Sequence, residues 1–285
     1  MRLRGTARHE SSATMTDPRR RSRRDALRVA AGLAGAVALS SAPVIAQPGG
    51  AQRRSFVLVH GAWHGGWCWR RVADRLEAAG HKVFTPTLTG LGERSHLLTS
   101  SLSLDTHILD VANVISWEGL SEVVLVGHSY AGFVVSGVVE RLPSAIAAIA
   151  LVDAYVPSDG QSMYDVATPS SRASLEAAMK SGDPVRAVPT AASFNVNERD
   201  RAWVDAKMTL QPVAPQLQKL RVSGALERIR PKAYVRAVGY PNPTFDAVLA
   251  TVRSRGGWET HEVRSGHDVM VDRPDELVKI LVGLL

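Results

Sequence analysis

The sequence predicts an α/β fold, in which a mostly parallel sheet is flanked by helices and carries an inserted helical cap. Short apolar runs such as Phe56–Val59 are typical of strands that are buried on both faces of a parallel sheet. These runs alternate with segments of helical spacing, which indicates crossover connections. The alternation stops from residue 157 to 230, where the pattern is helical and broken by prolines. We therefore predict a cap at 157–230 between the core segments 47–156 and 231–285.

Each element follows from its apolar pattern and its flanking turn residues. The segment 69–79 is amphipathic and is stopped by Gly80, and 105–117 places its apolar residues on one helical face. Strands are expected at 55–60, 82–85, 122–126, 145–152, 232–238 and 259–263. The helices are expected at 69–79, 105–117, 133–142 and 276–285.

The first 46 residues read as an export signal rather than as part of the fold. The segment 22–27, Ser-Arg-Arg-Asp-Ala-Leu, resembles the twin-arginine export motif. The apolar stretch 29–39 that follows is too short to span a bilayer. We expect cleavage after Ala46. The chain is then an exported bacterial protein, periplasmic or secreted by the twin-arginine route, with no membrane attachment after cleavage.

The charge distribution argues against nucleic acid as a partner. Residues 1–46 hold nine arginines and three acidic residues, whereas the whole chain carries +7, so about +1 remains for the rest. The sequence has no phosphate-binding GxxxxGK[ST] loop, no dinucleotide glycine fingerprint and no metal-ligand spacing. We expect no cofactor and no metal, and the pattern does not indicate an oligomeric state.

A serine stands between glycines where an apolar strand gives way to a helix. The stretch is Gly127-His128-Ser129-Tyr130-Ala131-Gly132. Such a strand–turn–helix context is typical of a nucleophile elbow, which predicts Ser129 as the nucleophile. Ala131 stands where the common form of the motif has glycine, and it is small enough to keep the helix close to the strand.

A serine hydroxyl needs a base and a set of donors for the oxyanion. His267 follows a late strand and precedes the last helix, so the chain order is serine and then histidine. The turn His60-Gly61-Ala62-Trp63 follows the first strand. We expect the backbone N–H groups of Ala62 and Tyr130 to form the oxyanion hole.

Long stretches of the sequence resemble a known family. They are "VLVHGAWHGGWCWRRVADRLEAAGHKVFTPTLTGLG", "GHSYAGF", "ALVDAYVPSDG", "QPVAP" and "SGHDVMVDRPDEL". They are similar to the plant-type methylesterase and hydroxynitrile-lyase branch of the α/β-hydrolase superfamily and its bacterial esterase relatives. The resemblance covers most of residues 55–285 and implies the α/β-hydrolase fold. It also implies a Ser-His-Asp triad that includes Ser129 and His267, with Ala62 and Tyr130 at the oxyanion hole.

The acid of the triad departs from the family pattern. The family places an aspartate just after the strand that corresponds to 233–238, where this chain has Tyr240. Three substitutes remain open. Asp153 ends the preceding strand, Asp246 lies a few residues beyond the usual place, and Asn242 could orient His267 without a charge. We favour Asp153.

These residues predict a serine esterase that acts through an acyl-enzyme. The expected substrate is a small-molecule ester of small to medium size with an apolar or aromatic part, and Trp63, Tyr155 and Trp203 are expected to bind it. The alternatives are a C–C lyase like the hydroxynitrile lyases, or a non-catalytic ligand-binding relative. The resemblance implies Glu before the serine and Lys after the histidine in a lyase, whereas this chain has His128 and Asp268.

Overall fold

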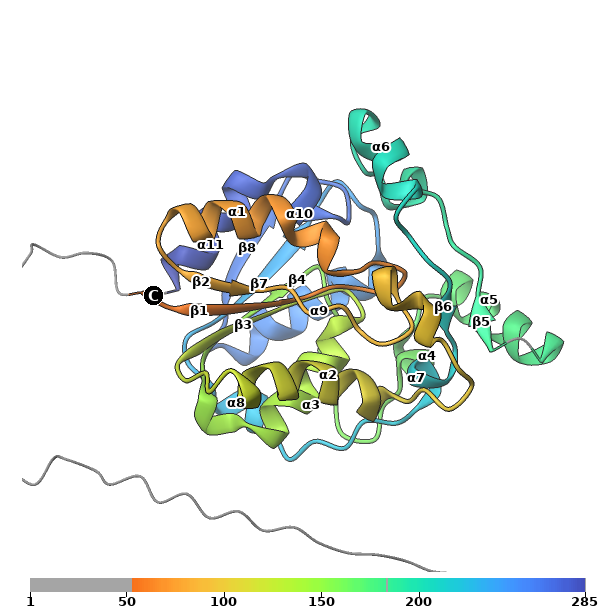
Figure 1. The fold of residues 1–285 in the computed structure, drawn as a ribbon, viewed down its shortest axis with the longest axis horizontal. Coiled ribbons are helices and arrows are strands. Elements are labelled where there is room, and N and C mark those ends of the chain that lie inside the picture. Colours follow the sequence, from red (N-terminus) through yellow and green to blue (C-terminus); the bar gives the residue numbers. More distant parts are fainter. Residues whose placement is uncertain (1–52, 183, 285) are drawn as a thin grey trace, which may run out of the picture. The chain divides into compact units, whose positions relative to one another are not determined.

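Six strands form one sheet whose strand pairings are all parallel (Figure 1). The strand order is β2-β1-β3-β4-β7-β8. The computed structural model describes residues 53–182 and 184–284, so the predicted export signal at 1–46 lies outside the described residues. The strands are β1 (Ser55–Val59), β2 (Lys82–Phe84), β3 (Val123–His128), β4 (Ile146–Val152), β7 (Lys232–Ala237) and β8 (Glu259–Val263).

Alternate strand side chains enter two separate cores, because a strand turns successive side chains to opposite faces. In β1, Phe56 and Leu58 join the core under α1, α10 and α11, whereas Val57 and Val59 join the core under α2, α3 and α9. Both faces of the sheet are therefore covered by helices (Figure 1), which confirms the predicted α/β class. These helices are α1 (Arg70–Ala78), α2 (Leu104–Trp117), α3 (Ala131–Arg141), α9 (Pro243–Arg255), α10 (Val269–Asp272) and α11 (Pro274–Gly283).

Most of the segment between β4 and β7 lies on the side of the sheet where the strands have their carboxyl ends (Figure 1). Its apolar residues join the two cores of the sheet: Leu175 packs with the α2–α3 core, and Phe194 with the α1–α11 core. The predicted division into a core and a cap at 157–230 stays a prediction. The elements are α4 (Met163–Val166), α5 (Pro169–Ser181), β5 (Val185–Arg186), α6 (Glu198–Asp205), β6 (Gln211–Pro212), α7 (Ala214–Leu217) and α8 (Ala225–Arg228).

The structure adds two helices, α9 and α10, that the apolar pattern did not single out. The 13-residue helix α9 buries only Phe245, Leu249 and Val252, so its amphipathic signal is weak. Its start is set by Asn242, whose side-chain oxygen accepts hydrogen bonds from the first turn of the helix. A cap of this kind is local chemistry and leaves no periodic pattern in the sequence.

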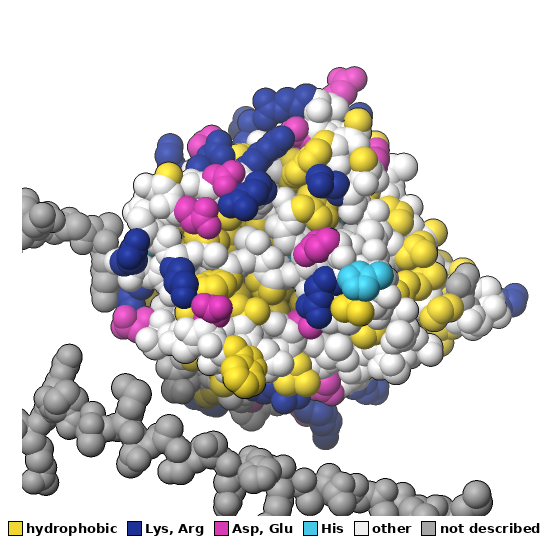
Figure 2. Space-filling model, viewed as in Figure 1, with side chains coloured by type: hydrophobic (Ala, Val, Ile, Leu, Met, Phe, Trp, Pro, Cys, Tyr) yellow, Lys and Arg dark blue, Asp and Glu magenta, His cyan; other side chains and the backbone are white. Residues whose placement is uncertain are grey.

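Acidic and basic side chains are interspersed on the face of the molecule that Figure 2 shows. Among residues 53–182 and 184–284, no helix combines the length and the apolar character needed to cross a membrane.

Candidate active site

Ser129 occupies a tight turn between β3 and α3. Its backbone φ is +54°, a value that few residues other than glycine adopt. The turn is held by a bond from Ser129 N–H to the Val152 carbonyl (3.2 Å) and by a bond from Tyr155 N–H to the Ser129 carbonyl (3.2 Å). Gly132 permits this close approach, because a Cβ atom there would overlap the Tyr155 carbonyl oxygen. The Ser129 side chain thus projects from the carboxyl end of the sheet.

Strained backbone gathers at this end of the sheet. Trp63, Ser129 and Asp153 have φ values of 63°, 54° and 44°, and each directly follows a strand or its connecting turn. Among the described residues, only two other non-glycine residues, Glu122 and Asn195, share this conformation. Positive φ at non-glycine residues costs free energy and tends to mark functional sites.

His267 lies beyond β8, and its ring is oriented by Asp153. The distance from its Nδ1 to Asp153 Oδ2 is 2.6 Å. The backbone N–H of His267 donates to the Phe194 carbonyl (2.8 Å), so the segment between β4 and β7 also holds this loop. In the described part of the chain, Nε2 of His267 makes no hydrogen bond, which leaves it free to accept a proton.

Asp153 is fully buried at the end of β4, and its second oxygen is also satisfied. Oδ1 accepts from Arg236 Nη1 (2.8 Å) and from Ala237 N–H (3.1 Å). The sheet order explains this meeting, because β7 lies between β4 and β8 and brings their carboxyl ends together. Burial opposes the charge of Arg236, but the charges of Asp153 and Asp246 outweigh it and raise the pKa of the guanidinium.

The other two acid candidates do not contact His267. Asp246 lies on α9 with 63% of its side chain exposed, and it pairs with Arg236 (2.8 Å). Asn242 is the N-terminal cap of α9, and its side-chain oxygen accepts from Thr244 N–H (3.0 Å) and Phe245 N–H (3.3 Å). Asp246 is therefore connected to Asp153, the partner of His267, only through Arg236.

The two predicted oxyanion donors lie on neighbouring turns. Ala62 follows β1, and Tyr130 precedes the first residue of α3. Neither backbone N–H donates to another described residue. A Cβ at Gly61 would lie 2.8 Å from His128 Nδ1 and 3.0 Å from Ser129 Cβ, so only glycine lets these turns meet. The Tyr130 side chain points into the core and its hydroxyl contacts His107 Nδ1 (3.0 Å).

A second buried histidine–aspartate pair lies beside the first. His64 Nε2 donates to Asp268 Oδ2 (3.0 Å), and His64 Nδ1 donates to the Ala62 carbonyl (2.8 Å). Burial lowers the pKa of His64, but the charge and hydrogen bond of Asp268 outweigh it, and the net pKa is raised. Burial raises the pKa of Asp268, but His64 outweighs it and the net pKa is lowered. The two groups form a buried ion pair next to the oxyanion turn.

His128, the residue before the serine, stays neutral in the same region. Burial, reinforced by the charge of His267, lowers the pKa of His128 well below its usual value. Its Nε2 donates to the His267 carbonyl (3.0 Å). His128 thereby ties the elbow to the loop that carries His267.

Ser129 and His267 line one cavity of about 450 Å³, together with Ala62, Trp63 and Tyr155. Trp203 was expected to bind substrate, but it lies outside this cavity. Its ring packs on α6 against Trp67 and under Arg71 instead. Helix α6 has too weak an apolar face for sequence alone to predict which way the tryptophan points.

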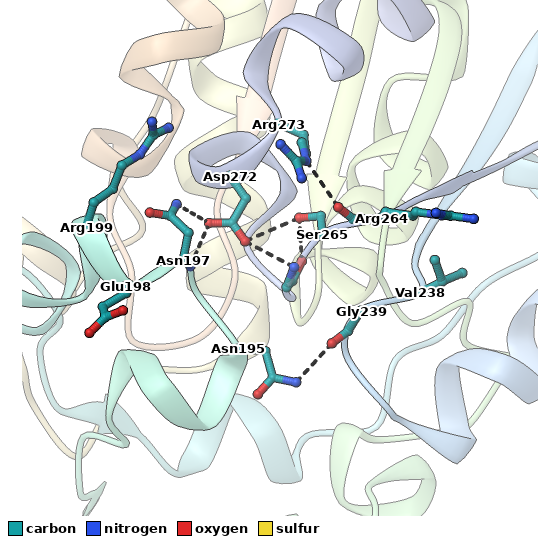
Figure 3. Close-up of a pocket in the computed structure, with 11 residues that line it drawn as sticks. Asn195, Asn197, Glu198, Arg199, Val238, Gly239, Arg264, Ser265, Asp272 and Arg273 are labelled. Atoms are coloured by element: carbon teal, nitrogen blue, oxygen red, sulfur yellow. Dashed lines mark hydrogen bonds between the residues drawn. The ribbon is translucent and has the colours of Figure 1, made fainter.

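A larger cavity of about 790 Å³ lies behind the His267 loop, and it contains neither Ser129 nor His267 (Figure 3). Asp272 is aimed at this loop. It accepts from Gly266 N–H (3.0 Å), and from the backbone N–H (3.1 Å) and side-chain amide (2.6 Å) of Asn197. These bonds hold the loop that carries His267 in place. We therefore regard the residues around this cavity as structural and not as part of the candidate active site.

The sequence did not indicate the contacts that Arg236, His64 and Asp268 make in this region. A signal existed for Arg236, because an arginine inside the apolar strand "KAYVRA" must find buried partners. For His64 and Asp268, only the folded structure shows that the two side chains meet. No group of three or more His, Cys, Asp or Glu within the described part of the chain is placed to hold a metal ion.

Comparisons with known proteins agree with this architecture. A model of the alpha/beta hydrolase family matches residues 56–280. A carbendazim-hydrolysing esterase from Nocardioides is 37% identical over 239 residues, which cover 81% of this chain and 99% of that enzyme. Methyl jasmonate esterase 1 from Vitis vinifera is 40% identical over 107 residues, which cover 37% of this chain and 41% of that enzyme.

Solved structures share the fold at lower sequence identity. An extracellular alpha/beta-hydrolase from a Paenibacillus species superimposes with a TM-score of 0.70 at 24% identity, covering 81% of this chain and 98% of its own. Tomato methylketone synthase I gives a TM-score of 0.67 at 17% identity, covering 81% of this chain and 96% of its own. At such identities the likeness concerns the fold, which supports several activities.

Proposed function

The chain belongs to the alpha/beta hydrolase family, and we propose that it is a serine esterase acting on carboxylic esters of small to medium size with an apolar or aromatic part. The observation that carries the proposal is the 2.6 Å contact between the buried Asp153 and His267, which lines the same cavity as Ser129. Asp153 fixes the ring so that Nδ1 is protonated and Nε2 can accept the serine proton.

In the acylation step, Ser129 Oγ bonds to the ester carbonyl carbon while its proton passes to His267 Nε2. The carbonyl electron pair moves to its oxygen, which the N–H groups of Ala62 and Tyr130 stabilise. The tetrahedral species collapses and breaks the bond to the alcohol oxygen. The alcohol leaves with the proton from His267, and the acyl group remains on Ser129.

In the deacylation step, water attacks the acyl carbon and gives its proton to His267. The bond to Ser129 Oγ then breaks, the serine recovers its proton, and the carboxylic acid is released. Asp153 stabilises the imidazolium that forms in each step, and Arg236 keeps this carboxylate oriented (2.8 Å).

The relatives support an ester as substrate. One is named for hydrolysis of carbendazim and another for hydrolysis of methyl jasmonate. The lyase alternative gains no support from the site, because Asp268 is fully buried and bonded to His64 (3.0 Å), away from any substrate. A purely ligand-binding role leaves the oriented His267–Asp153 pair without a purpose.

The test is turnover of short-chain p-nitrophenyl esters by the purified protein and by Ser129→Ala. We expect the substitution to lower kcat/KM by more than about 10³-fold, because it removes the hydroxyl oxygen that forms the acyl-enzyme. Ser158→Ala, which changes an exposed serine outside the cavity, serves as the control. Equal turnover by the wild type and Ser129→Ala would refute the proposal.

We also propose that residues 1–46 direct export by the twin-arginine route. The support is the sequence around Arg23 and Arg24 alone. Replacing both residues by lysine should keep the protein in the cytoplasm of a bacterial host, as measured by cell fractionation. Export of the doubly substituted chain at the wild-type level would refute this route.

A further inference from the structure

The cavity of the proposed esterase contains a buried arginine that the acyl-transfer mechanism does not use. Arg186 lies on β5, is 4% exposed, and lines the same cavity as Ser129 and His267. Its guanidinium covers the ring of Trp63, 4.7 Å from the ring centroid. Trp63 adjoins the oxyanion turn and is fastened to the same segment, since its indole N–H donates to the Ala187 carbonyl (3.0 Å).

The partners of Arg186 are neutral. Nη1 donates to Gln216 Oε1 (2.9 Å), Nε to Ser174 Oγ (3.2 Å), and Nη2 to Ser171 Oγ (3.2 Å). No carboxylate of the described residues lies within ion-pair distance of it. Burial lowers the pKa of Arg186 to about 10, so the group still carries its charge at neutral pH. Burying a charge without a counter-charge costs several kcal/mol.

This part of the cavity holds more donors than acceptors. Each terminal nitrogen of Arg186 carries a second N–H that has no acceptor among the described residues. Ser171 and Ser174 accept from Arg186 and keep their own O–H groups as donors, and both line the cavity. A ligand that fits this surrounding supplies acceptor oxygens and negative charge.

We propose that Arg186, Ser171 and Ser174 form a subsite for a carboxylate of the substrate, so that the enzyme takes esters that also carry a free carboxylate. The inference rests on the proposed esterase function and names its substrate class. A planar guanidinium matches the two oxygens of a carboxylate, and the charge of Arg186 gains its counter-ion when the substrate binds. Trp63 holds the guanidinium beside the oxyanion turn, which couples recognition of the carboxylate to placement of the ester.

The test compares monomethyl esters of straight-chain dicarboxylic acids, from succinate to suberate, with the corresponding dimethyl esters. Methanol release gives kcat/KM for each. We expect the wild type to prefer the monoester at one or two chain lengths, and that length reports the span from Arg186 to Ser129. In Arg186→Gln the ratio of monoester to diester kcat/KM should fall by about 10- to 100-fold, the loss of one charged hydrogen-bonded contact.

Two variants control for charge and for folding. Arg172→Gln removes an arginine from the same helix as Ser171 without touching the cavity lining, and it should leave the ratio unchanged. Arg186→Lys keeps the charge and should retain part of the preference. A wild type that prefers the diester at every chain length overturns the subsite, as does a ratio that is the same in wild type and Arg186→Gln.

Binding separates this proposal from the esterase proposal. Calorimetry with Ser129→Ala measures the affinity for the monomethyl esters when no turnover is possible, and the affinity should fall when Arg186→Gln is added. Turnover of esters without Arg186-dependent selectivity or binding refutes the subsite alone. Arg186-dependent binding without turnover by the wild type refutes the esterase alone, and the absence of both refutes both.

Discussion

Two buried histidine–aspartate pairs lie side by side at the carboxyl end of the sheet, and they differ in what surrounds them. Asp153 contacts His267 at 2.6 Å, and Asp268 contacts His64 at 3.0 Å. Both carboxylates are fully buried. Asp153 also pairs with the Arg236 guanidinium (2.8 Å), and Nε2 of His267 makes no hydrogen bond with a described residue. His64 has both ring nitrogens bonded, one of them to the Ala62 carbonyl.

The two pairs consist of the same residue types, so any difference in role between them must come from the neighbouring groups. The Asp153 charge is already balanced by Arg236, so His267 can gain and lose a proton without leaving a bare buried carboxylate. His64 must stay charged to balance Asp268, because no other cation is bonded to that carboxylate in residues 53–182 and 184–284. We therefore assign proton transfer to the proposed catalytic pair, His267 and Asp153, and a structural role to His64 and Asp268.

The largest difference between the two pairs is expected when the aspartate of each is replaced by asparagine. In Asp153→Asn, the amide oxygen should take the donors from Arg236 and Ala237, which turns the amide NH₂ toward His267 Nδ1. The ring is then forced into the tautomer whose Nε2 cannot accept a proton. We expect kcat to fall by about 10³- to 10⁴-fold, measured with p-nitrophenyl esters.

Asp268→Asn is the matched variant. A neutral His64 can still donate from Nδ1 to Ala62 and accept from the new amide at Nε2, so both contacts survive. We expect kcat to fall by no more than about tenfold. If the two asparagine variants lose activity equally, the two pairs do not differ in role as described.

Removing the second carboxylate altogether should affect folding more than chemistry. Asp268→Ala leaves the buried His64 without its counter-charge, and we expect the free energy of unfolding to fall by about 3–5 kcal/mol. Chemical denaturation followed by circular dichroism measures this loss. The double variant His64→Gln/Asp268→Ala should recover part of it, and a double variant less stable than Asp268→Ala would contradict the ion pair.

The pH dependence of stability provides a third test of the comparison. The raised pKa of His64 contributes stability that is full below its ordinary value of about 6.5 and is lost as pH rises through the folded value. The lowered pKa of Asp268 contributes stability above about 4, which is lost as pH falls through the folded value. The excess stability of wild type over Asp268→Asn should therefore be largest between about pH 4 and 6.5. If the stability difference between wild type and Asp268→Asn stays constant from about pH 4 to alkaline pH, His64 is not charged in the folded protein.

The smallest effect is expected at Asp246, the acid candidate that the structure places away from His267. Its ion pair with Arg236 is largely exposed on the carboxylate side. Asp246→Asn should change kcat by less than about threefold and stability by less than about 1 kcal/mol. A loss comparable to that of Asp153→Asn would identify Asp246 as the acid of the triad.

The sequence was sufficient for the six strands of the sheet and for helices α1, α2, α3 and α11, because both faces of the sheet are buried and leave continuous apolar runs. The predicted strand at 145–152 and the observed β4 (Ile146–Val152) differ by one residue. It also located Ser129 and His267, since each follows a strand and thus reaches the carboxyl end of the sheet. Their catalytic roles remain proposals that the experiments above test.

The choice of acid could not be settled from the chain alone, because it depends on which strand ends become neighbours. Asp153 and His267 are 114 residues apart, and the placement of β7 between β4 and β8 brings them into contact. His64 and Asp268 are 204 residues apart, and neither stretch of sequence carries a motif that predicts their ion pair. The position of Trp203 outside the cavity could not be predicted either, since an isolated aromatic residue carries no information on the direction of its side chain.

The segment between β4 and β7 is bonded to two turns of the candidate active site, and this limits how the segment can be exchanged. The Phe194 carbonyl holds His267 (2.8 Å), and the Gln211 side chain holds Trp63 N–H (2.9 Å). The segment is consequently not an exchangeable module. A chimera that imports this region from a relative inherits a new pocket only if it also reproduces these two anchor bonds.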